Sequence, residues 1–411
     1  MIFTGFSSNT TIKDIGIAVS YVFLPWKWFR VCSGKYVRLV EERISAYFLG
    51  AQAITFDSGR TALCALLCAG GVKKGDEVLL QAFTCVVVVN AIKYTGAKPI
   101  FVDIGDDGNM DVADMQKKYS SRTKAIIIQH TFGAAADVEA IMSFAKKKGV
   151  YTIEDCAHVF GGRHNGQLLG TFADAAMFSF GSDKPLSCGR GGVAITKKDD
   201  LSAKVRQYQE SLPSSTCVSV GKYLFQYLYF PLGKFCYRLY VGKILLFLSK
   251  TIGMTPLVIS KKEKQGEVDG YTQTTFPNAL AHILLGQLAN IDAVNLHRQA
   301  IATQYTKGLQ SINTITLSQV KHTEDVPLRY LLLTKKQSAV LAEGKKRGIV
   351  LGDWYTTVVA PKDVDLRHSE YVAGSCPRAE LFATQVVNLP THSGITEKEV
   401  RKILTCITDT I

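Results

Sequence analysis

The sequence predicts an α/β protein, with a large domain on a mostly parallel sheet and a smaller C-terminal α+β domain. Between residues 53 and 196, short apolar runs typical of strands alternate with amphipathic runs typical of helices. This alternation indicates strand–helix–strand crossover units and a sheet that helices cover on both faces. A long helical pattern at 276–309 and shorter patterns up to a last helix at 397–407 indicate a second unit. A chain of 411 residues is also long enough for two or three units.

The strands expected in the large domain are short apolar runs, and helical patterns such as 61–69 and 138–148 separate them. In sheets of this kind, ligands collect beyond the carboxyl ends of the parallel strands. Functional side chains should therefore come directly after these runs. The expected strands cover residues 53–56, 77–81, 98–104, 124–130, 150–155 and 191–196.

Composition narrows the class of protein. Apolar residues make up 47% of the chain and charged residues 20%, as in folded globular proteins. The ten cysteines stand singly among apolar residues, without a CxxC pair, so we expect no zinc site, no redox dithiol and no bound metal. Free thiols in a cytoplasmic protein are the simpler interpretation.

The formal net charge of +13 is concentrated in one segment. Residues 211–262 contain seven lysines and arginines and no acidic residue, and aromatic and leucine side chains lie between the basic ones. The cluster Trp26-Lys27-Trp28-Phe29-Arg30 has the same character. Such a mixture suits the headgroup region of an anionic membrane surface. The alternative is an ordinary helical insertion that packs on the body or in a dimer interface.

Two other interpretations of these segments are disfavoured. The uncharged runs at 15–26 and 223–233 are too short to cross a bilayer, which takes about 20 apolar residues. Nucleic acid is not expected as a partner, because the basic segment is leucine-rich and contains no known reading motif. A cytoplasmic protein, peripheral on the inner face of the membrane, is the localisation that we predict.

A carboxylate, a hydroxyl and a lysine lie close together in the segment 153–192. Asp155 closes one apolar run, and Ser179 and Lys184 follow another, just before a glycine-rich turn. Together they suit a cofactor with a protonated ring nitrogen for the carboxylate, a phosphate for the hydroxyl and an aldehyde for the amine. Singly, they have plainer interpretations: a helix cap, a turn serine and a solvated loop lysine.

This segment resembles the DegT/DnrJ/EryC1/StrS family of nucleotide-sugar aminotransferases, which have the type I pyridoxal-phosphate (PLP) transferase fold. In that family an EDxA(H/Q) motif precedes a Phe-Ser-Phe segment, a lysine and paired glycines. Here these are residues 154–158, 178–180, Lys184 and Gly191-Gly192. The resemblance extends over roughly residues 50–200 and 275–405, with further matches at 56–63, 74–78, 96–103, 376–380 and 389–392.

The resemblance implies a role for each matched residue. Lys184 would hold the cofactor as a Schiff base and move a proton between substrate and cofactor, and Asp155 would pair with the pyridinium nitrogen. The other implied contacts are Ser179 and the backbone amides of Gly59 and Arg60 at the phosphate, His158 near the phenolic oxygen, Cys85 on the cofactor face and His130 on the substrate side. The plainer alternative is that both histidines are ordinary core residues with satisfied hydrogen bonds. Cys85 would then be only a small buried apolar residue.

The chain also departs from the family pattern. Gly181 stands where the family has a histidine, Arg190 where it has a glutamate and Arg60 where it has a threonine. We expect the Arg60 side chain to pair with a surface carboxylate. Asn278, before the long helical pattern, is a candidate contact to a neighbouring subunit's phosphate. Lys184 favours amino transfer, because the sugar dehydratase branch of the family has histidine at that position.

The resulting prediction is a PLP-dependent aminotransferase that moves an amino group, from glutamate, to a nucleotide-linked keto sugar for polysaccharide or glycolipid synthesis. The resemblance also implies a homodimer. The alternatives are a PLP-dependent sugar lyase or dehydratase, and a non-catalytic membrane-surface protein on the same fold. The predicted units are an N-terminal segment (1–45), the PLP-binding domain (46–210), a basic aromatic insertion (211–265) and the C-terminal domain (266–411).

Overall fold

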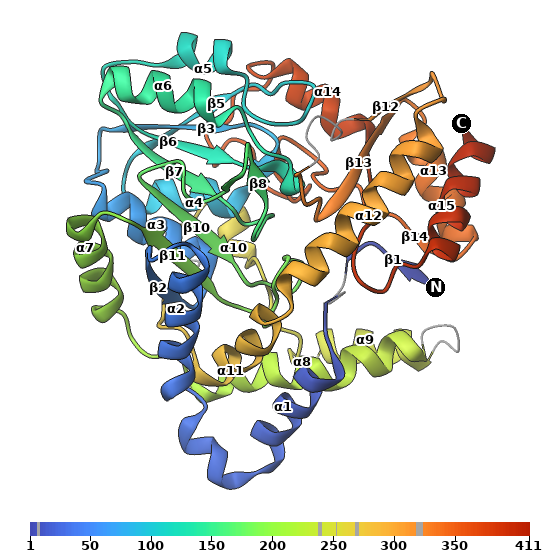
Figure 1. Cartoon of the computed structure of the whole chain (residues 1–411), viewed down its shortest axis with the longest axis horizontal. Coiled ribbons are helices and arrows are strands. Elements are labelled where there is room, and N and C mark those ends of the chain that lie inside the picture. Colours follow the sequence, from blue (N-terminus) through green and yellow to red (C-terminus); the bar gives the residue numbers. More distant parts are fainter. Residues whose placement is uncertain (6–8, 237–240, 252, 268–270, 318–323) are drawn as a thin grey trace.

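A seven-stranded sheet forms the centre of the large unit (Figure 1). Its strand order is β2-β11-β10-β7-β6-β3-β5, and within it only β11 runs antiparallel to its neighbours. The predicted mostly parallel sheet is therefore confirmed. Its strands are β2 (Gln52–Phe56), β3 (Glu77–Gln81), β5 (Lys98–Val102), β6 (Thr123–Gln129), β7 (Tyr151–Asp155), β10 (Ala175–Ser179) and β11 (Gly192–Thr196).

This computed structural model describes residues 1–411 except 6–8, 237–240, 252, 268–270 and 318–323.

Helices cover both faces of the sheet because successive strand side chains point to opposite sides. Ala175 and Met177 pack on the face with α3, α4 and α7, whereas Ala176 and Phe178 pack on the face with α2 and α11. Near β3, β5, β6 and β7 the second face is covered by α5 and α6. The bounds are α2 (Lys35–Tyr47), α3 (Gly59–Ala69), α4 (Val86–Tyr94), α5 (Val112–Lys118), α6 (Val138–Lys148), α7 (Asp199–Glu210) and α11 (Asn278–Leu288).

The long helical pattern predicted at 276–309 is two helices. α11 ends at Leu288, and α12 (Ile291–Leu309) continues at an angle of 61°. α11 packs into the large unit against α2, while α12 packs in the small unit. No single helix among the described residues is long and apolar enough to cross a bilayer; only the bent pair α11–α12 passes that test, taken together, and α11 is largely buried.

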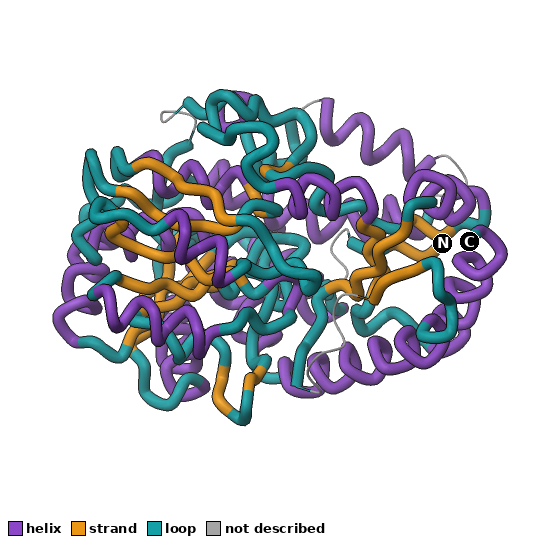
Figure 2. Tube along the Cα trace, turned by 90° about the horizontal axis from the view of Figure 1, so that it is seen from above, coloured by secondary structure: helices purple, strands orange, loops and turns teal. Residues whose placement is uncertain are grey.

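The small unit is a three-stranded antiparallel sheet with helices beside it. Its strand order is β12-β13-β16. The N-terminal strand β1 (Ile2–Phe3) also lies here, paired with β14 (Ile349–Val350), and both chain ends therefore lie together (Figure 2). The other elements are β12 (Ile315–Leu317), β13 (Arg329–Thr334), α13 (Gln337–Lys346), α14 (Pro377–Gln385), β16 (Val386–Pro390) and α15 (Glu397–Thr410).

Short elements connect the two units and shape the loops around the sheet edge. β15 (Val359–Ala360), from the C-terminal half, pairs with β4 (Thr84–Cys85) of the large unit. The remaining short elements are η2 (Thr131–Gly133), β8 (Arg163–His164), β9 (Gln167–Leu168) and α10 (Lys261–Lys264).

Four further elements form a lobe at one end of the large unit, at the bottom of Figure 1. α8 packs against α1 and α9, and α1 also contacts α11. We call this part the basal lobe, and it consists of α1 (Ile12–Phe23), η1 (Pro25–Arg30), α8 (Cys217–Phe235) and α9 (Val241–Thr251).

One close backbone contact fixes the start of α3 against the sheet. Phe56, Gly192 and Ser179 lie side by side on β2, β11 and β10. A Cβ atom at residue 192 would lie 2.3 Å from the backbone nitrogen of Gly59, and one at residue 59 would lie 2.9 Å from Cβ of Ser179. Glycine at both positions therefore lets the first turn of α3 approach the ends of β10 and β11.

We predict that Gly192→Ala destabilises the fold by about 1–3 kcal/mol, because the added methyl group overlaps the backbone of α3. Gly286→Ala, inside α11, is the matched control: its Cβ meets nothing within 4 Å, so it should be neutral or stabilise by up to about 1 kcal/mol. Urea unfolding measures both. Equal stabilities for the two variants would show that α3 does not lie this close to β11.

Candidate active site

Lys184 lies in a tight loop that joins β10 to β11. The loop is closed where the amide of Phe180 donates to the carbonyl of Gly191 (2.8 Å), and the amide of Lys184 donates to the carbonyl of Gly181 (3.1 Å). From the N-terminal segment, the amide nitrogen Nδ2 of Asn9 donates to the carbonyl oxygens of Lys184 (2.8 Å) and Pro185 (3.0 Å). The backbone of the lysine is thus held from both sides.

The Lys184 side chain points into a region of mixed charge. Burial lowers the pKa of its amine, and the positive charge of Arg329 adds to this, while Cys85 and Asp155 act in the opposite direction. Nζ makes no hydrogen bond to any part of the chain that the structure describes. A lowered pKa raises the fraction of neutral amine, which is the nucleophilic form.

Asp155 ends β7 with one carboxylate oxygen available. Oδ1 accepts a hydrogen bond from the amide of Ala157 (2.9 Å), while Oδ2 accepts none from the described residues. The side chain is buried, and burial raises the pKa of the carboxyl group although Lys184 opposes the shift. A cationic N–H group that donates to Oδ2 would stabilise the charged form of this carboxylate by a charge-assisted hydrogen bond.

His158 is a neutral ring held between two aromatic residues. Its Nδ1 accepts a hydrogen bond from the amide of Phe132 (3.2 Å), and its ring stacks on that of Phe132 with centroids 4.7 Å apart. Burial, with the charges of Lys184 and Arg329, holds its pKa well below the usual value. Because Nδ1 accepts, the proton sits on Nε2, which donates to the hydroxyl of Tyr355 (3.3 Å).

His130 does not line an open surface. It is fully buried, its Nδ1 accepts from the amide of Ala136 (3.2 Å), and its Nε2 donates to Glu154 (3.0 Å). Glu154 also accepts the amides of Gly170, Phe172 and Ala173. With both ring nitrogens used, His130 supports the β6 and β7 ends, and the structure does not place it on the substrate side.

The first turn of α3 and Ser179 form a cradle for an anion. The N-cap oxygen Oγ of Ser58 accepts the amide of Thr61 (3.2 Å), whereas the amides of Gly59 and Arg60 donate to no described group. Oγ of Ser179 lies 3.3 Å from where a Gly59 Cβ would stand, and it too has no hydrogen-bond partner among the described residues. Unpaired amides at a helix start bind phosphate well.

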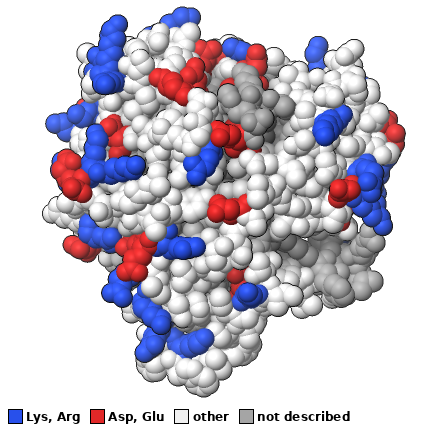
Figure 3. All heavy atoms as spheres, viewed as in Figure 1, with Lys and Arg blue, Asp and Glu red and all other residues white. Residues whose placement is uncertain are grey.

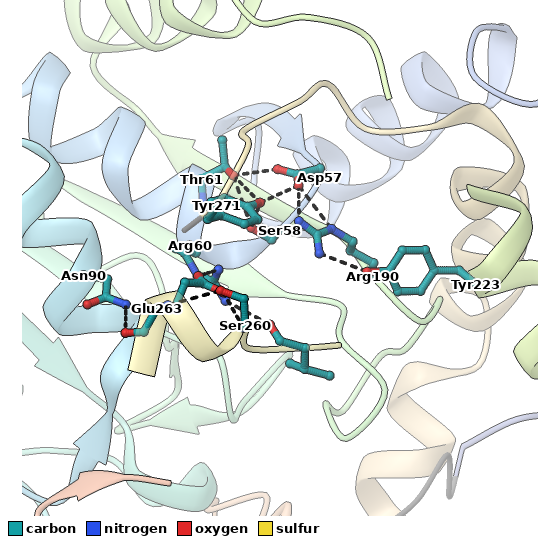
Figure 4. A network of polar contacts seen from close by, with 11 residues as sticks. Asp57, Ser58, Arg60, Thr61, Asn90, Arg190, Tyr223, Ser260, Glu263 and Tyr271 are labelled. Carbon is teal, nitrogen blue, oxygen red and sulfur yellow. Dashed lines mark hydrogen bonds and ion pairs between the residues drawn. The ribbon is translucent and has the colours of Figure 1, made fainter. Parts of the chain in front are cut away.

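Arg60 and Arg190, both departures from the family pattern, belong to one buried network (Figure 4). Both guanidinium groups lie over the ring of Tyr271, at 4.3 and 5.0 Å. Arg190 pairs with Asp57 (2.6 Å) and donates to the hydroxyl of Tyr223 (2.9 Å). Tyr271 in turn donates to Asp57. Arg60 and Arg190, the two residues that differ from the family pattern, therefore pack against the same tyrosine.

The Arg60 side chain pairs with Glu263, which is only 2% exposed, and not with a surface carboxylate as the sequence predicted. Glu263 also accepts the amide of Ser260 (2.8 Å) as part of the α10 capping box, and its carbonyl accepts Asn90 Nδ2 (3.0 Å). The network thus ties α10 to the starts of α3 and α4. The Arg60 side chain is thus engaged with Glu263, whereas its backbone amide donates to no described group and belongs to the anion cradle.

The structure also places Cys85 and Asn278, two further residues that the sequence predicted at the site. Cys85, at the end of β4, interacts electrostatically with Lys184, Arg60 and Asp155, and burial raises the pKa of its thiol. Asn278 is buried and donates to the carbonyl of Arg30 (2.7 Å), while its Oδ1 accepts the amide of Tyr36 (2.9 Å). Its amide group is therefore used within its own chain, to hold the turn between η1 and α2.

Three further residues, Arg329, Tyr355 and Asn9, lie around Lys184 and His158 and were not predicted from the sequence. Arg329 begins β13 in the small unit and its side chain is 12% exposed. Its charge lowers the pKa of both Lys184 and His158, and among the described residues it pairs with Asp183 at 3.9 Å. All three residues come from segments far from the central motifs, so no local pattern pointed to them.

The sheet, its crossover helices and the lysine loop at its carboxyl end define the type I fold of the aminotransferases. The chain matches the DegT/DnrJ/EryC1/StrS aminotransferase family over residues 21–218 and 248–408, and it belongs to that family. Residues 219–247, which make up most of α8 and part of α9, lie outside the match.

Named relatives and solved structures agree with this assignment. A GDP-perosamine synthase of Escherichia coli O157:H7 is 39% identical over 169 residues, which cover 41% of this chain and 46% of that protein. One of Caulobacter vibrioides is 26% identical over 91% of this chain and 90% of that protein. The chain spans about half the length of the first relatives it matches, 46% to 48%.

Two solved structures show the same fold. DesV of S. venezuelae, in complex with a ketimine intermediate, has a TM-score of 0.75 at 23% identity over 97% of this chain and 94% of that one. A putative sugar aminotransferase, Spr1654 of Streptococcus pneumoniae, in its PLP form, has a TM-score of 0.74 at 19% identity over 100% and 99%.

We predict that Arg60→Leu or Glu263→Leu alone destabilises the protein by about 3–5 kcal/mol, because each leaves a buried charge unpaired. The double variant should lose much less than the sum, since it removes both charges. Denaturant unfolding of the three variants gives the coupling energy. Additive losses would mean that the two side chains do not interact.

Proposed function

We propose that this protein is a PLP-dependent aminotransferase that transfers an amino group from glutamate to a nucleotide-linked keto sugar. The observation that carries the proposal is the placement of Lys184 with an available Asp155 oxygen and an anion cradle at the start of α3. Family membership and relatives named as perosamine synthases and sugar transaminases support this substrate class.

The described residues fit PLP. Its phosphate matches the unpaired amides of Gly59 and Arg60 with the Ser179 hydroxyl, its ring nitrogen matches Asp155 Oδ2, and its aldehyde matches the Lys184 amine. When bound, the cofactor supplies an aldehyde carbon that amines attack and a ring that withdraws electrons from the substrate carbon.

The protein's own part in the reaction is binding, orientation and proton transfer. Lys184 Nζ, whose pKa is lowered, would take the proton from the carbon of the donor and pass it to the cofactor, and in the second half-reaction it would move a proton from the cofactor to the carbon of the sugar. Asp155 would hold the ring nitrogen protonated. His158, fixed as a neutral ring between Phe132 and Tyr355, keeps the wall of the site in place.

Arg329 supplies a cation for an anionic part of the substrates. Its guanidinium group lies near Lys184 and donates to Oδ1 of Asn388 (3.4 Å), and among the described residues its ion-pair partner is Asp183 at 3.9 Å. Glutamate carries two carboxylates, and guanidinium groups bind carboxylates with two parallel hydrogen bonds. We infer that Arg329 binds a donor carboxylate.

The assembly and location belong to the same proposal. A homodimer in the cytoplasm, peripheral on the inner membrane face, would deliver the amino sugar where surface polysaccharides or glycolipids are made. The family resemblance supports the dimer, and the basal lobe supports the membrane contact.

Purified protein mixed with PLP should develop a visible absorbance band that Lys184→Ala lacks, and glutamate should convert the band to that of the amino form of the cofactor. Lys124→Ala, which changes an exposed lysine, is the control and should behave as wild type. Absence of the band in wild-type protein would overturn the catalytic proposal.

Product analysis separates amino transfer from the alternatives. With a nucleotide-linked keto sugar and glutamate, the proposal predicts an amino sugar and 2-oxoglutarate in equal amounts. A deoxygenated or cleaved sugar without 2-oxoglutarate would indicate a dehydratase or lyase instead.

Ser179→Ala should weaken PLP binding about tenfold or more, because a hydrogen bond to a charged group contributes about 1.5–3 kcal/mol. Ser182→Ala changes the same loop outside the cradle and should leave the dissociation constant unchanged. Fluorescence titration measures both, and an unaltered constant for Ser179→Ala would exclude that hydroxyl from the phosphate site.

A further inference from the structure

The basal lobe exposes apolar side chains in a regular pattern. On α1, Ile12, Val19 and Phe23 point to solvent at the spacing of one helix face, while Ala18 and Tyr21 point into the protein. Ile12 is 88% exposed and Phe23 62%. A helix that buries one apolar face and exposes another needs a second contact surface.

The stripe on α1 continues onto aromatic side chains of η1. Trp26, Trp28 and Phe29 are exposed, Phe29 by 89%. The indole nitrogen of Trp28 donates to the carbonyl of Val22 (3.3 Å), so its polar group is already satisfied. Tryptophan is enriched where proteins meet the headgroup zone of membranes.

α9, which also packs on α8, exposes a second apolar stripe. Val241, Ile244, Phe247 and Leu248 lie on its solvent face, with Phe247 68% exposed. Both stripes thus belong to helices that pack on α8, a helix mostly outside the residues that match the family. Of the exposed surface, residues 12–20 of α1 and 241–247 of α9 also lie outside that match, whereas η1 lies inside it.

The charge of the basal lobe is one-sided. Its only acidic residue is Asp14, which is buried, accepts hydrogen bonds from Thr11 and Gln287, and adds no negative charge to the surface. In Figure 3 the lower end of the molecule is mostly uncharged, with basic side chains beside it. The basic residues of these four elements are Lys13, Lys27, Arg30, Lys222, Lys234, Lys243 and Lys250.

This charge distinguishes between two occupants of the surface. A second copy of the chain in a twofold dimer would place the same surface against itself, so basic groups would face basic groups with no acidic partner. An anionic lipid surface instead supplies the opposite charge, and its headgroup zone accepts the aromatic and aliphatic side chains.

We propose that the basal lobe is a docking surface for an anionic lipid bilayer, with the exposed stripes of α1 and α9 in the headgroup zone and the aromatic side chains of η1 inserted into the lipid. The inference does not depend on the proposed chemistry, since no residue of the active site takes part. It gives the enzyme a fixed position at the membrane while the sheet edge with Lys184 remains outside the contact.

Flotation of the full chain with vesicles tests the proposal. The protein should float with vesicles of phosphatidylglycerol and phosphatidylcholine, much less with phosphatidylcholine alone, and less at high salt. Each basic residue near an anionic surface contributes roughly fivefold to binding. Lys13→Glu with Arg30→Glu should therefore reduce binding at least about 25-fold, and Trp26→Ser with Phe29→Ser should reduce it on both vesicle types.

The matched control is Lys146→Glu with Lys147→Glu, which makes the same charge change at exposed positions on α6, at the opposite end of Figure 1. It should float like wild type, and unfolding midpoints of all variants should agree because the changed side chains are exposed. Failure of wild type to float at low salt, equal binding to neutral vesicles, or an equal loss in the control would each overturn the proposal. So would a lobe variant that dissociates a dimer without any change in flotation.

Tryptophan fluorescence gives an independent readout. The chain has three tryptophans, Trp26, Trp28 and Trp354, so Trp354→Phe leaves only the two in η1 as reporters. Anionic vesicles should shift their emission to shorter wavelength, and brominated lipids should quench it. Emission that stays unchanged in the presence of vesicles would mean that η1 does not enter the lipid.

Discussion

The close packing of the α3 start against β10 and β11 is the constraint on which the site depends. Gly59 and Gly192 allow this approach because neither carries a side chain. The approach sets the unpaired amides of α3 beside Ser179 at the end of β10, five residues before Lys184. Backbone geometry thus brings the end of β10, the start of α3 and the amine of Lys184 to one point. The side chains of Ser179 and Asp155 complete the site.

Charge compensation around that point explains why unusual residues are tolerated. Two arginines replace smaller or acidic family residues, and each has acquired a buried carboxylate partner, Asp57 or Glu263. Since a buried ion pair contributes little net stability but costs much when one partner is lost, the pairs act mainly to fix where α10 and the segment around Tyr271 lie. The backbone donors of the anion cradle are available because they belong to the first turn of α3, where amides have no partner within the helix.

Much of the central architecture could be predicted from the sequence. Strand runs of β-branched and aliphatic residues, and the order of motifs around Asp155, Ser179 and Lys184, located the sheet and the lysine loop to within a few residues. The break between α11 and α12 was not predicted, because the residues at 289–290 interrupt no apolar pattern. His130 is buried against Glu154, and Arg60 pairs with the buried Glu263. Neither partner was predicted, because a contact between distant segments leaves no local pattern in the sequence. Arg329 was missed for the same reason: it reaches the site only through the packing of the small unit.

The most direct test of the account is to trap the cofactor on the protein. Borohydride reduces a carbon–nitrogen double bond to a stable amine, so PLP bound to a lysine remains attached through digestion and mass spectrometry. We expect a single modified peptide with the label on Lys184, in wild type and in the basal-lobe variants alike. A label on another lysine, or none, would contradict the central claim that the loop between β10 and β11 holds the reactive amine.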